Sequence, residues 1–226
     1  SGKTTVIKML TTLLPPTSGR AVVDGHDLRR EPAGVRDSIG YVPQLVSADG
    51  TLSGRENLLI FAKLYGIPRA ELRPRIAQAL QFVGLAEAAD RQVRGYSGGM
   101  VRRLEIAMAM MHRPRVLFLD EPTTGLDPLA RQAVWRQIGL LVSQFGMTIF
   151  LTTHFMEEAD ALCGRVAIMH LGRVVAAGRP DDLKAGIGRP GASLEDVFAH
   201  YAGDRSETEG NYGDISRNRR NIARLG

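Results

Sequence analysis

Five residues at the start of the sequence, SGKTT at positions 1–5, have types suited to holding a phosphate group. They match the end of the phosphate-loop pattern G-x-x-x-x-G-K-[ST], in which backbone N–H groups at a helix N-terminus face phosphate oxygens. In that pattern Lys3 reaches the β and γ phosphates, and the Thr4 hydroxyl binds magnesium. Because G-K-T also occurs by chance in unrelated chains, the pentamer alone is weak support for a nucleotide site.

A second stretch, VLFLDE at positions 116–121, places two adjacent carboxylates after an apolar run. The run predicts a buried strand of a parallel sheet, with Asp120 at its carboxyl end, where nucleotide hydrolases hold magnesium. Glu121 follows directly and can polarise an attacking water. The alternative is that both acids only end the strand and cap the next turn. The SGKTT segment upstream favours the functional interpretation.

The stretch YSGGM, from Tyr96 to Met100, indicates a second anion site far from the first in sequence. Ser97 can cap the helix that follows, and Gly98 and Gly99 let a phosphate approach the backbone near the positive end of the helix dipole. Two consecutive glycines cost helix stability, so they need a reason beyond capping.

Short apolar strands alternate with helical stretches along the chain, which is typical of an α/β fold. We expect strands within 20–25, 39–43, 116–120 and 147–153, and a hairpin around Leu171-Gly172. We expect helices over 4–14, 100–112, 128–144, 156–162 and 194–201, and two successive helices within 55–85. The helical part, about 45–112, is interpreted as an insert within the sheet-forming body.

Composition limits the classes of function that are compatible with the chain. Its 226 residues are 44% hydrophobic and 23% charged, with a single cysteine, Cys163, which excludes an internal disulfide and fits a reducing compartment. No apolar run approaches the ~18 residues that a membrane span requires. The net charge of +5 is mild, and the last twelve residues carry four arginines and no acid. We interpret the polar segment 204–226 as a solvated terminus, and we expect no nucleic-acid partner.

Six motifs in one order give the chain a resemblance to the ATP-binding-cassette (ABC) ATPases: SGKTT, Gln44 in YVPQ, YSGG, LFLDEP, TGLD and Thr153-His154. Three longer stretches, VSADGTLSGRENL, YSGGMVRRLE and LTTHFMEEADALC, resemble ATPase subunits of bacterial multidrug exporters of the daunorubicin-resistance type. ATPase subunits of exporters of Nod-factor lipo-oligosaccharides share the sequence HFMEEA. The resemblance implies a P-loop nucleoside triphosphate hydrolase fold of the ABC type over residues 1–203, with a helical subdomain inserted in a mixed sheet core.

The resemblance also implies roles for individual residues at the ATP site. The phosphates of ATP would be bound by Ser1, Gly2, Lys3, Thr4, Thr5, Gln44 and His154. Magnesium would be held by Thr4, Gln44 and Asp120. Catalysis would rest on Glu121 as general base, with Gln44 and with His154, which senses the γ-phosphate and orients the water.

Two copies of such a subunit pack head to tail, so the resemblance implies a homodimer with two ATP molecules between its subunits. The signature residues Tyr96, Ser97, Gly98, Gly99 and Met100 would then close on the partner's ATP. Asp127 in TGLD would couple the two sites across the dimer. Met100 departs from the glutamine usual at that position, in a form familiar from the exporter subgroup.

The implied function is an ATP-hydrolysing subunit of a bacterial exporter of a drug, antibiotic or similar amphiphile. The helical insert would receive a short helix of a membrane permease on a separate chain, which places the subunit at the cytoplasmic face of the membrane. The alternatives are export of another substrate, such as a lipid or lipo-oligosaccharide, and a non-transport ABC-type ATPase. The first glycine of the phosphate loop, the strand before it and the adenine-stacking aromatic are absent from the sequence. We therefore expect an N-terminally truncated chain that binds ATP poorly alone.

Overall fold

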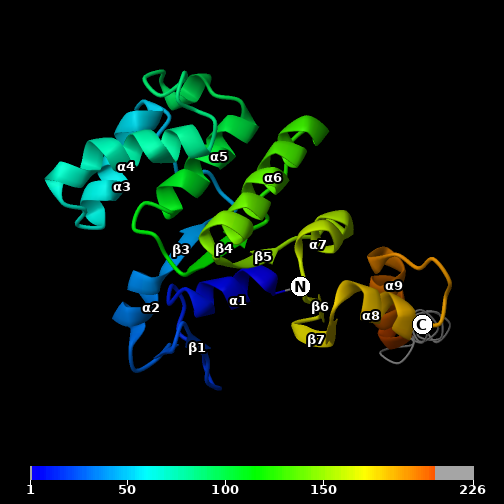
Figure 1. Ribbon diagram of the computed structural model, residues 1–226. Helices are drawn as coiled ribbons and strands as arrows, with labels where there is room; N and C mark the ends of the chain where they lie inside the picture. Colours follow the sequence, from blue (N-terminus) through cyan, green and yellow to red (C-terminus); the bar gives the residue numbers. More distant parts are fainter. Residues whose placement is uncertain (1, 207–226) are drawn as a thin grey trace, which may run out of the picture. The chain divides into compact units, whose positions relative to one another are not determined.

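The computed structural model describes residues 2–206, which form two compact units divided between Phe155 and Met156 (Figure 1). Each unit has its own buried core and is described by itself. Ser1 and residues 207–226, which hold most of the predicted tail, lie outside the described residues.

A parallel three-stranded sheet is the centre of the first unit, with β3 (Ile39–Val42) and β5 (Thr148–Thr152) on either side of β4 (Val116–Asp120). The apolar residues predicted to form a buried strand do so, since Leu117, Phe118 and Leu119 are at most 2% exposed. The register aligns Asp120 with Thr152, so the carboxyl ends of the strands meet at one edge. The antiparallel strand pairs of the described residues, β1 with β2 and β6 with β7, form separate two-stranded sheets, and Ser53 and Gln92 form an isolated antiparallel bridge.

Short elements cover the sheet near the N-terminus. They are α1 (Lys3–Leu10), β1 (Val22–Val23), β2 (His26–Asp27) and α2 (Pro32–Ser38). Ile7 of α1 and Val35 of α2 are fully buried against Phe118 of the central strand. Burial of such side chains contributes about 1.5–3 kcal/mol each, which fixes α1 beside β4.

The helical insert contains α3 (Gly54–Leu64), α4 (Arg69–Phe82), the short 3₁₀ helix η1 (Val93–Gly95) and α5 (Gly98–Ala109). Figure 1 shows these helices as one group beside the sheet. Ser53 and Glu56 form a reciprocal capping box at the start of α3, which satisfies two backbone N–H groups there. The insert has an apolar core of its own, which includes Leu58, Leu80 and Leu104.

Helix α6 (Pro128–Phe145) completes the first unit and packs against α5 and β5. It begins at Asp127, whose Oδ1 accepts a hydrogen bond from the N–H of Ala130 at 2.9 Å. It ends at Gly146, whose φ of 61° is the left-handed conformation that glycine adopts without strain.

The second unit is a small α/β unit of α7 (Met156–Leu162), β6 (Val166–His170), β7 (Arg173–Gly178), α8 (Pro180–Gly186) and α9 (Leu194–Ser206). The predicted hairpin is present, with β6 and β7 antiparallel around Leu171-Gly172. Ile168, Leu183, Leu194 and Val197 form most of its buried core.

Some predicted boundaries were wrong. The first helix was expected to reach residue 14 but ends at Leu10, since Thr12 has a φ of 62° and breaks the helix before the Pro15-Pro16 pair. Helix α5 begins at Gly98, ahead of the predicted start, because Ser97 caps it. Helices α2 and α8, of seven residues each, were not predicted.

Candidate functional site

The carboxylate of Asp120 lies at the carboxyl edge of the sheet, in a residue only 1% exposed. Its Oδ1 accepts a hydrogen bond from Thr4 Oγ1 at 3.2 Å and another from Thr152 Oγ1 at 2.5 Å. Its Oδ2 is buried and has no hydrogen-bond partner. A buried carboxylate oxygen without a donor is costly unless a cation or water reaches it, so this atom fits a hard divalent ion such as Mg²⁺.

Such an ion would need ligands beyond carboxylates. Among residues 2–206, His, Cys, Asp and Glu side chains nowhere gather in a group of three or more that could hold a metal alone. Magnesium is commonly bound by one or two carboxylates together with phosphate oxygens and water. The set at Asp120 therefore fits a magnesium ion that arrives with a phosphate ligand.

The start of α1 forms the phosphate side of the site. Gly2 precedes the helix with a φ of 92°, a conformation that a residue with a Cβ rarely adopts. The N–H groups of Lys3, Thr4 and Thr5 lie in the first helical turn, where they have no intrahelical acceptor. Those of Thr4 and Thr5 can face an anion, helped by the positive end of the helix dipole.

Glu121 brings the ends of all three strands together. Its Oε2 accepts hydrogen bonds from Gln44 Nε2 at 3.2 Å and Thr124 Oγ1 at 3.0 Å. His154 Nδ1 lies 3.2 Å from the same oxygen and donates to it when that nitrogen is protonated. Oε1 accepts no hydrogen bond from residues 2–206, so it is open to a water. The backbone N–H of Glu121 donates to Thr152 O at 3.0 Å, which fixes the position of the side chain.

The loop that carries Gln44 is tied to α5 by a buried ion pair. Arg102 donates to the carbonyls of Pro43 at 2.7 Å and Gln44 at 3.0 Å. Glu105 Oε1 accepts from the hydroxyl of Ser47 at 2.9 Å and also from its backbone N–H. Arg102 Nη1 and Glu105 Oε2 lie 3.1 Å apart and form an ion pair. Their relative orientation does not make this contact a hydrogen bond. These contacts hold the site loop against α5.

The segment YSGGM caps and begins α5. Ser97 Oγ accepts from the N–H of Met100 at 3.3 Å, and Ser97 and Gly98 are exposed. Gly99 is buried, and a Cβ there would lie 2.8 Å from Ala130 Cβ. Close packing against α6 thus supplies a reason for the second glycine that does not involve phosphate. Tyr96 turns away and donates its hydroxyl to Ala88 O at 2.6 Å.

The structure brings together only part of the predicted site. Thr4, Gln44, Asp120, Glu121 and His154 are linked by side-chain hydrogen bonds at the sheet edge. No hydrogen bond or ion pair within residues 2–206 joins the Ser97–Met100 segment to that cluster. Asp127 is exposed and caps α6, and Ser1 lies outside the described residues. This separation agrees with two phosphate sites that serve different ligands.

Four contributors to the site were not predicted from the sequence, and they are Arg102, Glu105, Thr124 and Thr152. The i, i+3 spacing of Arg102 and Glu105 is common in solvated helix pairs, so the sequence carried no sign that the pair is buried. Thr152 lies in a predicted strand, and its partner is known only once the register is known.

Cys163 follows α7 in the second unit and is half-buried. Burial raises the pKa of its thiol to about 11, and the negative charge of Glu158 adds to the effect. The thiolate is therefore scarce at neutral pH, which does not fit a nucleophile.

A parallel sheet, a helix that begins with the end of the phosphate-loop pattern and a strand-end Asp-Glu pair are the features of a P-loop nucleoside triphosphate hydrolase fold. The ABC transporter family model matches residues 1–124, so the chain belongs to that family, and membership implies nucleotide binding. A solved structure titled as the ATP-binding subunit of an ABC transporter superposes with a TM-score of 0.75. It is 31% identical, and the match covers 88% of this chain and 83% of that one.

Two curated relatives are similar over most of the chain. A daunorubicin resistance ATP-binding protein of Streptomyces coeruleorubidus is 46% identical over 90% of this chain and 63% of its own length. A Nod factor export ATP-binding protein of Cupriavidus metallidurans is 43% identical over 81% of this chain and 60% of its own length. The chain thus spans less than two thirds of the length of the relatives it matches.

Proposed function

We propose that the chain binds and hydrolyses ATP as the energy-supplying subunit of a bacterial exporter, with a drug, antibiotic or similar amphiphile as cargo. The observation that carries the proposal is the hydrogen-bonded cluster at the sheet edge, where Thr4, Asp120 and Glu121 meet the ends of the neighbouring strands. The names of the two relatives, daunorubicin resistance and Nod factor export, support an export substrate of this chemical kind.

In the proposed site the phosphate chain of ATP lies along the start of α1. The N–H groups after Gly2 and the ammonium of Lys3 would meet its oxygens, with Ser1 and Thr5 alongside. Asp120, Thr4 and Gln44 would hold Mg²⁺, which neutralises phosphate charge when bound. The unpartnered Oδ2 of Asp120 is the support for this assignment.

Hydrolysis needs a proton acceptor near the γ-phosphorus. Glu121 Oε1 would take a proton from a water molecule as the water oxygen forms a bond to the γ-phosphorus. The bond between the γ-phosphorus and the oxygen that bridges the β and γ phosphates would break, releasing ADP and phosphate. His154 and Gln44 both contact the other oxygen, Oε2, and so hold the carboxylate in one orientation. His154 would also meet the γ-phosphate, since half of its side chain is exposed.

The signature segment would complete a site on a second copy of the chain. Ser97 and Gly98 are exposed at the start of the twelve-residue helix α5, whose dipole favours an anion. We propose a homodimer in which this segment, with Tyr96 and Met100 at its borders, closes on the partner's ATP. Asp127, exposed at the start of α6, would couple the two sites.

The ATPase domain is proposed to span 1–203, with 45–112 as the subdomain that meets a permease on a separate chain. Exposed apolar side chains of this subdomain support such a contact, notably Leu45 at 81% and Leu64, the last residue of α3, at 74%. Among residues 2–206 no helix is long and apolar enough to cross a bilayer. The proposed location is the cytoplasmic face of the membrane, as a peripheral subunit.

The test uses protein with a complete phosphate loop and compares ATP turnover of the wild type with that of Glu121→Gln. Removing the general base should lower kcat by about 10²–10⁴-fold while ATP still binds, and the dimer should persist longer on the uncleaved nucleotide. Turnover is measured by phosphate release, ATP binding by equilibrium titration, and assembly by light scattering.

Glu87→Gln is the matched control, because Glu87 is exposed on the helical insert and makes no contact with the cluster. It should hydrolyse ATP as the wild type does. Equal turnover in Glu121→Gln and the wild type would remove Glu121 from the role of base.

A further inference from the structure

A cavity of about 570 Å³ lies in the first unit at the opposite end of the sheet from Asp120 and Glu121. It opens between α4 and the segments that lead into β4 and β5, at Val116 and Thr148. Its volume is within the range of about 300–1,000 Å³ typical of small-molecule sites. None of the residues assigned to ATP or magnesium lines it, and Val116 is the only residue that it shares with the stretch VLFLDE.

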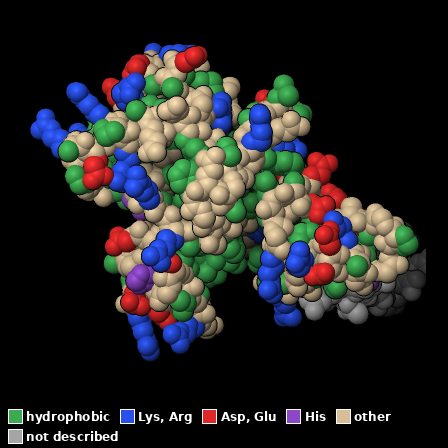
Figure 2. Space-filling model, in the orientation of Figure 1, with side chains coloured by type: hydrophobic (Ala, Val, Ile, Leu, Met, Phe, Trp, Pro, Cys, Tyr) green, Lys and Arg blue, Asp and Glu red, His purple; other side chains and the backbone are tan. Residues whose placement is uncertain are grey.

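The walls of the cavity are largely apolar and adaptable. Phe82 of α4 and Phe145 at the end of α6 meet edge to face, with ring centroids 5.1 Å apart. Met110, Met111 and Met147 add flexible thioether side chains, which fit ligands of varied shape. Hydrophobic side chains lie over the middle of the face shown in Figure 2, where the helices meet the sheet.

Three guanidinium groups line the same cavity, and they differ in whether an acidic side chain pairs with them. Arg75 pairs with Glu71 and donates to Met111 O at 3.3 Å. Arg115 lies 3.6 Å from Asp24 and keeps 81% of its side chain exposed. Arg113 makes no side-chain hydrogen bond or ion pair with residues 2–206. With Asp24 the only acid in the lining, the cavity carries net positive charge.

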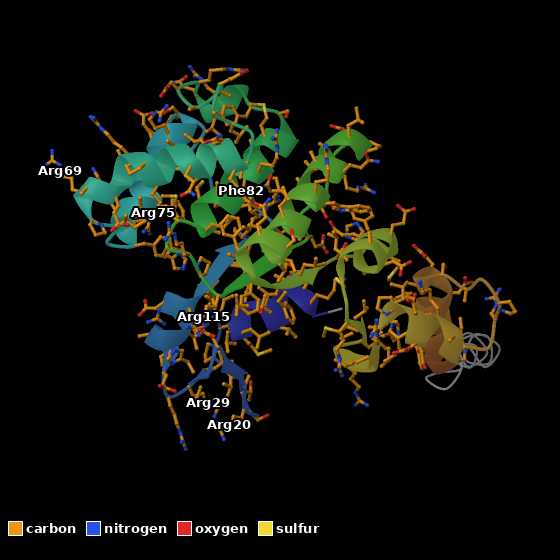
Figure 3. All side chains as sticks on the ribbon, in the orientation of Figure 1. Arg20, Arg29, Arg69, Arg75, Phe82 and Arg115 are labelled. Atoms are coloured by element: carbon orange, nitrogen blue, oxygen red, sulfur yellow. The ribbon has the colours of Figure 1, made fainter. Side chains whose placement is uncertain are left out.

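The cavity combines these charges with apolar walls supplied by different elements. Figure 3 shows Arg75 and Phe82 on α4 and Arg115 near the start of the sheet, whereas Arg69 extends into solvent at the far end of α4. The C-terminal ends of α5 and α6, at Ala109 and Phe145, are also close by and contribute partial negative charge. These partial charges offset part of the positive charge, so the cavity suits at most one anionic group, paired with Arg113, and not a polyphosphate.

We propose that this cavity is a second binding site, distinct from the nucleotide site, for a small amphiphilic monoanion with an aromatic or aliphatic body. The body packs between Phe82, Phe145 and the methionines, and the acid group pairs with Arg113. Such a ligand contacts the helical insert through α4 and the sheet through Met147, so its occupancy restrains one against the other.

The first experiment uses 8-anilinonaphthalene-1-sulfonate, an aromatic monoanion, on the protein labelled with ¹³C-methyl methionine. Of the eight methionines in the sequence, Met110, Met111 and Met147 line the cavity. Their methyl signals should shift on titration with 1:1 stoichiometry, while those of Met9 and Met169 stay in place. Shifts confined to other methionines, or displacement of the probe by excess ATP and Mg²⁺, would overturn the proposal.

The second experiment removes the unpaired charge. Arg113 has a φ of 58°, so Arg113→Gly deletes the guanidinium in a conformation that glycine favours and should not unfold the protein. The affinity of the Arg113→Gly variant for 8-anilinonaphthalene-1-sulfonate should be about tenfold lower than that of the wild type. Arg69→Ala, on α4 but outside the cavity, is the control and should bind as the wild type does. Unchanged affinity in Arg113→Gly would contradict the assignment.

A third measurement separates charge recognition from hydrophobic adsorption. Decanoate, decanol and decyltrimethylammonium share one chain length and differ in head-group charge. Decanoate should displace the probe, and the other two should be at least about tenfold weaker because they cannot pair with a guanidinium. Equal displacement by the cationic amphiphile would exclude an anion site.

Discussion

Glu121 has a backbone conformation that few residues with a side chain adopt, with a φ of 49°. A non-glycine residue in this region costs on the order of 1–3 kcal/mol, which the surrounding structure must offset. Three hydrogen bonds offset this cost. The N–H of Glu121 donates to Thr152 O, and Gln44 and Thr124 donate to the Glu121 carboxylate. Strain held in this way is common where function selects the geometry, which agrees with the role proposed for Glu121.

His112 is predicted to make stability depend on pH. Its Nε2 donates to Ile39 O at 2.8 Å, its ring stacks on Tyr65 at 3.8 Å, and its Nδ1 is buried without a partner. Burial lowers the pKa of His112, against smaller opposing effects of Ile39 and Asp37. Because the unfolded chain takes up the proton first, stability should be full above about pH 6.5 and fall below it, by up to ~1.4 kcal/mol per pH unit.

Urea unfolding between pH 7.5 and 5.5 measures this effect. His112→Gln, which can still donate to Ile39, should lose that part of the slope, whereas His200→Gln, at an exposed position on α9, should keep it. The same slope in His112→Gln and the wild type would show that another group is responsible.

At the scale of elements, the pair Arg102–Glu105 is predicted to be coupled in stability. Their side chains are 7% and 1% exposed, so Arg102→Met leaves a buried carboxylate without its cation and should cost about 3–5 kcal/mol. Replacing both, as Arg102→Met with Glu105→Gln, should recover at least ~1 kcal/mol of that loss. Chemical denaturation of the single and double variants measures the coupling.

Arg73→Met is the control for this cycle, since Arg73 is exposed on α4 and should lie within about 0.5 kcal/mol of the wild type. Purely additive losses in the double variant would mean that the two side chains act independently. Because Arg102 also bonds to the carbonyl of Gln44, its loss should lower kcat for ATP as well if the proposed site is correct.

The elements of the first unit could be predicted where their apolar pattern is continuous, as for Val116–Asp120 and the helix from Pro128. The meeting of Asp120, Glu121 and His154 also follows from parallel strands, whose carboxyl ends share one edge. The contacts of Arg102 and Thr152 depend on packing and register between segments remote in sequence. No local pattern contains that information, so these residues became visible only in the folded structure.

At the scale of the whole molecule, the two units should differ in local stability. The core of the first contains strand β4, in which every residue after Val116 is buried, whereas every residue of β7 in the second is partly or fully exposed. Native-state hydrogen exchange should therefore show β6 and β7 opening at least ~2 kcal/mol below β4. Equal opening free energies and equal urea dependence for both sheets would indicate a single cooperative unit.

The contact between Gly99 and Ala130 has a consequence for how such sequences diverge. Alanine at position 99 of α5 would clash with Ala130 of α6, because a Cβ at position 99 would lie 2.8 Å from Ala130 Cβ. Larger residues at either position are then compatible only with a wider separation of α5 and α6. The two positions are thus expected to vary as a correlated pair among homologues, and this pair sets the spacing of the two helices.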